Sequence, residues 1–198
     1  MVALSVRDDL LAAGLAVFDR EGLGGATVAA IRAQAGVSNG SFFHFFESKR
    51  ELAGALFVEV LRHYHAALLA VLDPAPPARE GIAALIGAHL DWVVNSRREA
   101  RYLFELSRNE WSEAVREAQR TENARFAEGI ERWRAPLVAS GELLAMTPAL
   151  FASQIIGPAQ IFCRAYLAAR DRADPRQHGE ALIACAIRAL TPSERIAS

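Results

Sequence analysis

Small polar side chains gather between residues 38 and 44, where they could hydrogen-bond to the exposed edges of nucleic-acid bases. Ser38, Asn39, Ser41 and His44 all carry hydrogen-bonding groups within this one short segment. Gly40 lies among them, although glycine is a poor helix former in a first helical turn. Its presence favours a backbone that approaches another molecule closely. This segment is therefore the candidate for molecular recognition.

Two cationic residues follow, in the first turn of the next predicted helix. Positive charge at this end opposes the helix macrodipole and costs roughly a few tenths of a kcal/mol. A phosphate close to Lys49 or Arg50 would offset that cost. Lys49 is also the only lysine of the chain. The pair therefore favours a phosphate-bearing partner such as DNA.

Two predicted helices joined by a tight turn must position these groups. Thr27 can cap a helix that ends near Ala35, and Ser38 can cap another that ends near Phe46, because their hydroxyls accept backbone N–H groups. Gly36 supplies the turn. This is the helix-turn-helix pattern, whose second helix enters the major groove of DNA. The side chains expected on its buried side are Val28, Ile31, Val37, Phe42, Phe45 and Phe46.

The rest of the chain also carries helix signals, and we find no convincing strand. A first helix is expected from Ser5 to Glu21, and a long helix opens at a capping box formed by Ser48 and Glu51. Prolines within residues 73–77 end that helix. Further helices are expected around residues 82–93, 102–106, 110–139, 148–170 and 175–190. The expected fold is all-α, with about nine helices.

Residues 27–52 resemble the signature of the TetR/AcrR family of one-component transcriptional regulators. The resemblance rests on TVAAI at residues 27–31, on AGVSNGSFFHFFESK at residues 35–49 and on Leu52. It covers about an eighth of the chain at fixed spacing. It implies an N-terminal helix-turn-helix domain of three helices, residues 1–48, and a C-terminal helical domain, residues 49–198, that senses a ligand and dimerises.

The resemblance further implies a repressor that binds a palindromic operator in double-stranded DNA and is released by a small-molecule effector. A homodimer would form through the last two long helices, where the apolar side chains expected at the interface are Ile155, Phe162, Tyr166, Leu182 and Ile187. The residues that would line the DNA by motif position are Thr27, Ser38, Asn39, Ser41, Phe43, His44 and Lys49, and Gly40 lies among them.

Three features depart from the family pattern. Arg32 stands where the family usually has alanine, so its side chain must extend outward or reach a phosphate. Phe43 lacks the hydroxyl that a tyrosine would offer to a phosphate. Residues 1–50 contain five basic and five acidic side chains and are formally neutral. We therefore expect DNA binding to depend on local placement rather than on bulk charge.

The C-terminal helices carry aromatic and histidine side chains that could line a pocket. Aromatic residues at helical spacing usually form core, but a subset can enclose an apolar cavity between helices. The candidates for binding an apolar or amphipathic effector are His63, His89, Trp92, Tyr102, Phe126 and Tyr166.

No metal site is expected in this region. His63 and His65 are two residues apart on a helix and point to different faces. Cys163 and Cys185 lie on the last two predicted helices without metal-ligand spacing. They are either small hydrophobic residues or a redox pair, and the second role requires both thiols within disulfide reach.

The composition excludes several other classes. The sequence has no phosphate loop, no serine-histidine-aspartate signature and no dinucleotide fingerprint, so we expect neither an enzyme nor a cofactor. It has no charged-then-apolar leader and no apolar stretch that could cross a bilayer, so we expect a cytoplasmic protein without a membrane partner. A helical adaptor that kept the fold without sequence-specific DNA binding is the alternative function.

Overall fold

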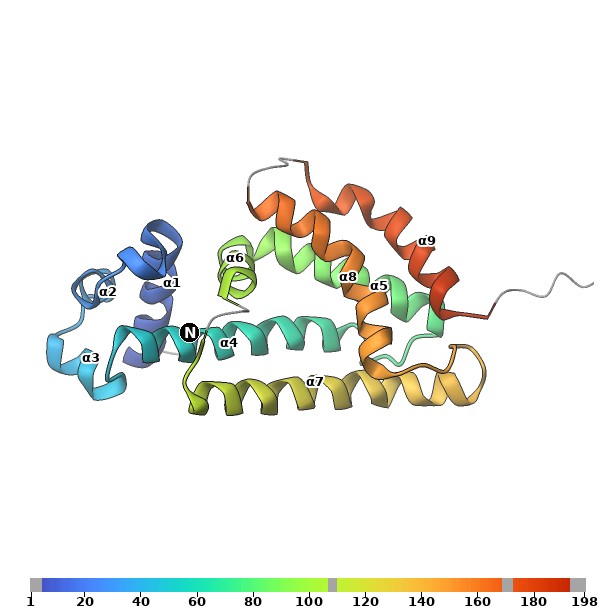
Figure 1. Ribbon diagram of the computed structural model, residues 1–198, viewed down its shortest axis with the longest axis horizontal. Helices are drawn as coiled ribbons and strands as arrows, with labels where there is room; N and C mark the ends of the chain where they lie inside the picture. The colour runs from blue at the N-terminus through green and yellow to red at the C-terminus, as the bar shows by residue number, and fades with distance from the viewer. Residues whose placement is uncertain (1–4, 107–109, 169–172, 193–198) are drawn as a thin grey trace, which may run out of the picture. The chain divides into compact units, whose positions relative to one another are not determined.

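The computed structural model describes residues 5–106, 110–168 and 173–192. Within these residues the chain forms nine α-helices and one 3₁₀ turn and has no strand, which confirms the all-α prediction (Figure 1). The elements are α1 (Val6–Gly25), α2 (Val28–Ala35), α3 (Asn39–Phe45), α4 (Lys49–Ala70), α5 (Ala78–Asn95), α6 (Arg97–Leu106), α7 (Glu113–Ala139), α8 (Pro148–Leu167), η1 (Pro175–His178) and α9 (Gly179–Leu190).

The chain divides into two compact units, and the division passes within α4 and α7. The first unit contains the described residues of 1–62 and 98–122, and the second those of 63–97 and 123–198. The first unit thus extends beyond the predicted boundary at residue 48, because α6 packs onto the N-terminal helices. The Tyr102 ring stacks on Phe18 at 5.7 Å, and its hydroxyl donates to the Ala53 carbonyl at 2.8 Å.

Helix ends in the first unit follow from local side-chain chemistry. Ser5 and Asp8 form a capping box at the start of α1. Helical geometry breaks at Gly22, whose φ is 69°, so the predicted end near Glu21 marks a kink before a last turn that continues to Gly25. Leu10, Val17 and Phe18 of α1 are buried in this unit.

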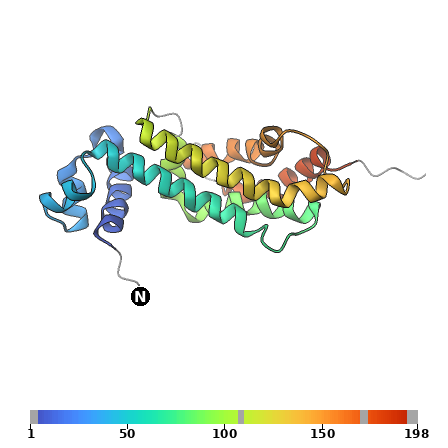
Figure 2. The ribbon, with the colours of Figure 1, turned by 90° about the horizontal axis from the view of Figure 1, so that it is seen from below.

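Two glycines bring α4 and α7 close together. In the first unit, a Cβ on Gly54 would lie 2.5 Å from Val115 Cγ2, and in the second a Cβ on Gly129 would lie 2.6 Å from Leu69 Cδ2. A Cβ contact under 3.0 Å is essentially never seen, so a larger residue at either position would force the opposing Val115 or Leu69 side chain to move. Figure 2 shows the two helices side by side.

The second unit packs α5 against both α8 and α9. Thr147 caps α8 with Pro148 at its first turn, and the predicted end near Arg170 lies outside the described residues. Asp174 also caps its helix, but what begins at Pro175 is the 3₁₀ turn η1, and α9 starts only at Gly179. Within the described part of the chain, no helix combines the length and apolar character needed to cross a membrane.

Candidate nucleic-acid interface

The turn between α2 and α3 is built from side-chain caps and one left-handed residue. Thr27 Oγ1 accepts from the Ala30 N–H at 3.1 Å, and Ser38 Oγ accepts from the Ser41 N–H at 3.1 Å. Gly36 has φ 67° and ψ 28°, a conformation that L side chains rarely adopt. The predicted caps and turn are therefore confirmed, and they fix the start of α3.

The first two turns of α3 present a mixed polar and aromatic surface. Asn39, Gly40 and His44 are exposed, and Phe43 keeps 50% of its surface accessible. The Ser41 hydroxyl lies 2.9 Å from that of Ser38 and is half-buried. The α3 residues predicted to line DNA thus have accessible side chains, or a bare backbone at Gly40, within one short helix.

The buried side of α3 differs from the prediction at one phenylalanine. Phe42 and Phe46 are buried with exposures of 0% and 3%, whereas Phe45 is 37% exposed and the prediction of a buried ring there is wrong. Residues four apart share a helix face, so Phe42 and Phe46 occupy the inward side together. Phe45 instead packs edge-on against the His44 ring at 4.8 Å.

Lys49 is held by the end of α1. Its Nζ donates to the carbonyl oxygens of Leu23 at 2.7 Å, Gly24 at 3.3 Å and Ala26 at 2.6 Å. These carbonyls lie in and just after the last turn of α1, where the helix dipole is negative. The cost of a cation at the start of α4 is therefore offset within the protein, so its position does not by itself indicate a phosphate.

The residues next to Lys49 also form hydrogen bonds within the protein. The Arg50 guanidinium donates to the Glu110 carbonyl. Ser48 caps α4 by accepting from the Glu51 N–H at 3.1 Å, as predicted. The reciprocal bond is displaced by one residue, because the Glu51 carboxylate accepts from the Glu47 N–H at 2.6 Å.

Arg32 turns toward α3. Its Nη1 donates to Asn39 Oδ1 at 3.1 Å, and the side chain is half-buried between the two helices. The buried Nε has no hydrogen-bond partner among the described residues. Instead of extending away from the motif, Arg32 thus connects α2 with the first residue of α3.

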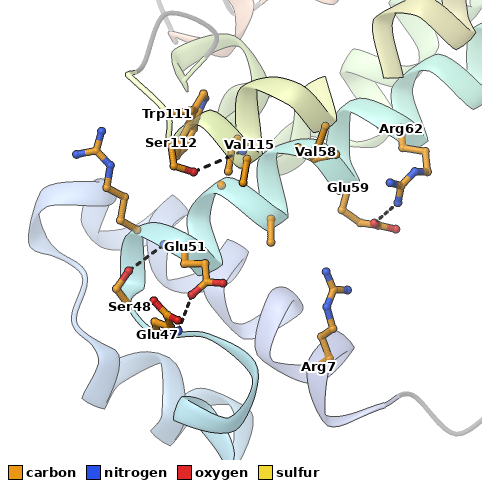
Figure 3. Close-up of a pocket in the computed structure, with 15 residues that line it drawn as sticks. Arg7, Glu47, Ser48, Glu51, Val58, Glu59, Arg62, Trp111, Ser112 and Val115 are labelled. Carbon is orange, nitrogen blue, oxygen red and sulfur yellow. Dashed lines mark hydrogen bonds and ion pairs between the residues drawn. The ribbon is translucent and has the colours of Figure 1, made fainter. Parts of the chain in front are cut away.

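A cavity of about 690 Å³ lies in the same unit, lined by residues of α1, α4 and α7 and of the segments before α4 and α7 (Figure 3). Its lining carries both charges, with three arginines (Arg7, Arg50 and Arg62) and three glutamates (Glu47, Glu51 and Glu59). Arg62 pairs with Glu59 at 2.5 Å (Figure 3) and with Glu122 at 3.7 Å. Because the charges balance, the cavity does not extend a phosphate-binding surface from α3.

A buried polar chain crosses the second unit. The Tyr64 hydroxyl lies 2.8 Å from His89 Nδ1, and Cys163 Sγ lies 3.6 Å from His89 Nε2. Burial lowers the pKa of His89 to about 4 and raises that of Cys163 to about 12, because a low-dielectric surrounding disfavours both charged forms. Burial also raises the pKa of Tyr64. All three groups are therefore neutral at pH 7.

An apolar cavity lies along the same helices. It has a volume of about 30 Å³, room for no more than a few water molecules. Leu68 of α4 and Leu85 of α5, which line it, are four residues from Tyr64 and His89, one turn along their helices. The other lining residues are Phe126, Ile130, Phe151, Ala152, Ile155 and Ile156. The hydrogen-bonded series Tyr64–His89–Cys163 and the apolar cavity are thus both formed by residues of α4, α5 and α8.

The predicted effector residues do not form one cluster. His89 and Trp92 gather around Tyr64, whose ring is 4.7 Å from that of Trp92. Phe126 lines the apolar cavity and stacks on His65 at 4.2 Å.

The other three candidates lie elsewhere. His63 is exposed on α4, and Tyr166 lies under the Arg97 guanidinium, 4.6 Å from its ring centre. Tyr102 belongs to the first unit.

Sequence reasoning missed the partners that make this buried chain. Neither Tyr64 nor Cys163 was expected to contact His89, and Cys163 was expected to be either a small hydrophobic residue or half of a redox pair. The available signal was the helical phase of Tyr64 with Leu68, which places both on one face. The long-range pairing of α4, α5 and α8 was not readable from spacing.

The two cysteines have different surroundings. Cys163 is buried, Cys185 is exposed, and both are free thiols. Within the described residues, no three histidine, cysteine or acidic side chains converge in a way that could hold a metal ion.

A helix-turn-helix with an exposed recognition helix, in an otherwise all-α chain, defines the class of helix-turn-helix proteins. Residues 10–56 match the model for bacterial regulatory proteins of the tetR family. A protein from Shewanella sp. PV-4 assigned to that family is 24% identical, with a TM-score of 0.72 over 96% of this chain and 100% of the other.

Two further solved structures share the fold. A tetR-family regulatory protein from Rhodococcus RHA1 is 20% identical, with a TM-score of 0.77 over 97% of this chain and 100% of the other. The transcriptional regulator FadR from Bacillus subtilis, in complex with stearoyl-CoA, is 16% identical, with a TM-score of 0.75 over 90% of this chain and 96% of the other. Residues 10–56 thus match the N-terminal model of tetR-family regulatory proteins, and the chain shares the fold of these solved structures.

Proposed function

We propose that the protein is a transcriptional repressor that binds a palindromic operator as a homodimer and is released by an apolar or amphipathic effector. The observation that carries this proposal is the start of α3, where Asn39, Gly40, Phe43 and His44 are exposed on a helix fixed by the Ser38 cap. An N-terminal turn of this kind suits the major groove, where short polar side chains meet base edges.

DNA binding is assigned to the N-terminal segment, residues 1–48, with the long α4 following it. Thr27 and Ser38, both exposed at the starts of α2 and α3, would lie beside the backbone, and Asn39, Ser41, Phe43 and His44 would face the groove. Lys49 contributes by holding the end of α1, and a phosphate contact would require it to give up a carbonyl partner.

Dimerisation is assigned to α8 and α9, where apolar side chains remain uncovered. Ile161 is 70% exposed and Phe162 36%, although isoleucine is among the most often buried residue types. Tyr166, Leu182 and Ile187 are half-buried, so they retain surface for a partner. The expected interface residue Ile155 is instead 3% exposed and lines the apolar cavity. A second copy covering this face would give an isologous interface, whose two-fold axis matches a palindrome.

Such a dimer would place its two recognition helices in successive major grooves, roughly 34–36 Å apart or a multiple of that distance. Effector binding would favour a state with a different spacing, and it can do so only through unequal affinity for the two states. The helix α4 is the proposed lever, because Lys49 at its start bonds to the end of α1 and Tyr64 and Leu68 lie near its other end.

The effector site is assigned to the apolar cavity and the neighbouring polar chain. The cavity is lined by aliphatic and aromatic side chains, and its volume of about 30 Å³ requires it to widen around a ligand. Tyr64, His89 and Cys163 would meet a polar head group and the cavity an apolar tail. The complex of a similarly folded regulator with stearoyl-CoA supports a ligand of this amphipathic type.

Selection of bound sequences from random duplex DNA, with the full chain, tests the proposal. An enriched palindrome supports the repressor. An absence of any enriched sequence would leave the adaptor function, which the neutral charge of residues 1–50 also permits.

Sedimentation at micromolar concentration tests the dimer. We expect Ile161→Glu to give a monomer that no longer binds the palindrome, because a charge would be buried in the interface. Leu144→Glu is the matched control, since Leu144 is 40% exposed in the segment between α7 and α8, outside both the proposed interface helices and residues 1–48. A wild-type protein that sediments only as a monomer would refute this mechanism.

A further inference from the structure

Arg32 and Asn39 form a contact that determines which edge of the Asn39 amide faces outward. Arg32 Nη1 donates to Asn39 Oδ1 at 3.1 Å across the turn that joins α2 and α3. Among the described residues, no hydrogen bond involves the Asn39 Nδ2, and the side chain is exposed at the first position of α3. The oxygen is thus held toward α2, and the amino group is left for an external partner.

An isolated asparagine can present either edge, because rotation about its last side-chain bond exchanges the oxygen and the amino group. The guanidinium of Arg32 has only donors, so the exchanged arrangement would place two donors against each other. The charged donor also makes this hydrogen bond stronger than one between neutral groups. Arg32 therefore fixes the orientation of the Asn39 amide, with its oxygen turned toward α2 and its amino group as the outward-facing donor.

We infer that Arg32 is a specificity-determining residue that sets Asn39 to donate its amide hydrogens to base acceptors in the major groove. This inference rests on the proposed DNA-binding function and deepens it. The acceptors are N7 and O6 of guanine, N7 of adenine and O4 of thymine. Cytosine presents its amino group there, which would oppose a donor. The paired contact of asparagine with adenine N6 and N7 needs the amide oxygen and the amino group to face the base together, whereas the bond to Arg32 turns the oxygen toward α2.

The burial of Arg32 supports positioning rather than a direct phosphate contact. The side chain is half-buried, and its Nε is enclosed without a hydrogen-bond partner in the described part of the chain. An arginine that served phosphates would be expected to direct its guanidinium to solvent instead of to a neighbouring side chain. A phosphate role would lower affinity for all sequences equally and reduce the salt dependence of binding.

The test uses the full chain and the sequence enriched from random duplex DNA. Equilibrium binding is then measured for that sequence with each of the four bases at every position, for wild type, Arg32→Ala, Asn39→Ala and the double variant. Arg20→Ala is the charge-matched control, because Arg20 is exposed on α1 and pairs with Glu21 at 2.7 Å. Cooperative thermal unfolding establishes that each variant is folded.

We expect Asn39→Ala and Arg32→Ala each to lose an about tenfold base preference at the same position of each half-site. The double variant should lose no more than either single one, because the two side chains act as one unit. Arg20→Ala should keep the preference. If Arg32→Ala does not unfold cooperatively, Arg32→Met removes the donors at similar volume and carries the same expectation.

Two results would overturn the inference without touching the proposed function. One is an unchanged base preference in the folded Arg32 variant. The other is an equal loss on all sequences with a reduced salt dependence, which would assign Arg32 to a phosphate. A wild-type protein that enriches no sequence would overturn the proposed function and this inference together.

Discussion

Replacing Gly40 with alanine tests whether this glycine is needed for the stability of the protein or for its affinity for DNA. Gly40 is in the first turn of α3, and its φ is not in the left-handed region. A Cβ built there meets only Ser38 Oγ, at 3.8 Å, which is ordinary van der Waals contact. Nothing within the described structure therefore requires glycine at this position.

The substitution should stabilise the free protein. Alanine is favoured over glycine in a helix by about 0.8–1 kcal/mol, and a first-turn position should give roughly half of that. For a chain of this length the melting temperature should rise by about 1–2 °C. Thermal unfolding followed by circular dichroism measures the shift.

The same substitution should weaken operator binding. If the α3 backbone approaches the DNA closely, the added methyl group must displace it, and overpacking of this kind costs about 1–3 kcal/mol. The dissociation constant should then rise by about fivefold or more. Fluorescence anisotropy with the selected operator measures the loss. Gly87→Ala on α5 is the control, since a Cβ there meets nothing within 4 Å. It should raise stability without changing affinity.

The reasoning fails if Gly40→Ala binds the operator as tightly as wild type while its melting temperature rises. Gly40 would then not be needed for a close approach of the α3 backbone to DNA, and neither stability nor DNA binding would explain a glycine at this position. It would also fail if Gly87→Ala lost affinity to the same degree, because the loss at Gly40 could then not be assigned to the DNA surface.

Three further predictions concern Lys49, His89 and the two thiols. Lys49→Ala should lower the free energy of unfolding by about 2 kcal/mol, because its Nζ donates to three carbonyls in and just after the last turn of α1. If the slope of log K against log salt concentration for DNA binding instead fell by about one, Lys49 would be assigned to a phosphate. His89 is neutral when folded, with its pKa lowered to about 4, while the unfolded imidazole takes a proton near 6.5. Wild type should therefore lose up to about 3 kcal/mol of stability as the pH falls from 6.5 to 4, and urea unfolding should show a smaller loss for His89→Gln. A maleimide at pH 7 should modify Cys185 and spare Cys163, because Cys185 is exposed and burial raises the pKa of Cys163 to about 12. Two labels on the native protein, counted by mass spectrometry, would contradict this.

Local chemistry was readable from the sequence. The caps at Thr27 and Ser38 were predictable because a hydroxyl directly before a helix can accept the free N–H groups of its first turn. Gly36 was predicted for its turn, and the structure gives it a positive φ. These features depend on residues within a few positions of one another.

Long-range pairing was not readable. Lys49 was assigned to a phosphate because its partners, the carbonyls of Leu23, Gly24 and Ala26, lie 23 to 26 positions away and have no side-chain signature. Arg32 was expected to point outward, because nothing in its spacing indicates that Asn39 accepts from it. The Phe45 side chain was assigned inward because a run of aromatic residues does not reveal where a seven-residue helix ends.

The bonds of Lys49 have a practical consequence for work with the purified protein. The chain has one lysine, so reagents that couple to side-chain amines have a single target, and that amine holds the end of α1. Surface immobilisation or dye labelling through amines would remove the charge and its hydrogen bonds and would disturb the domain under study. The exposed thiol of Cys185 avoids Lys49, but it lies on α9 within the proposed dimer face, so a label there tests dimerisation as well as DNA binding.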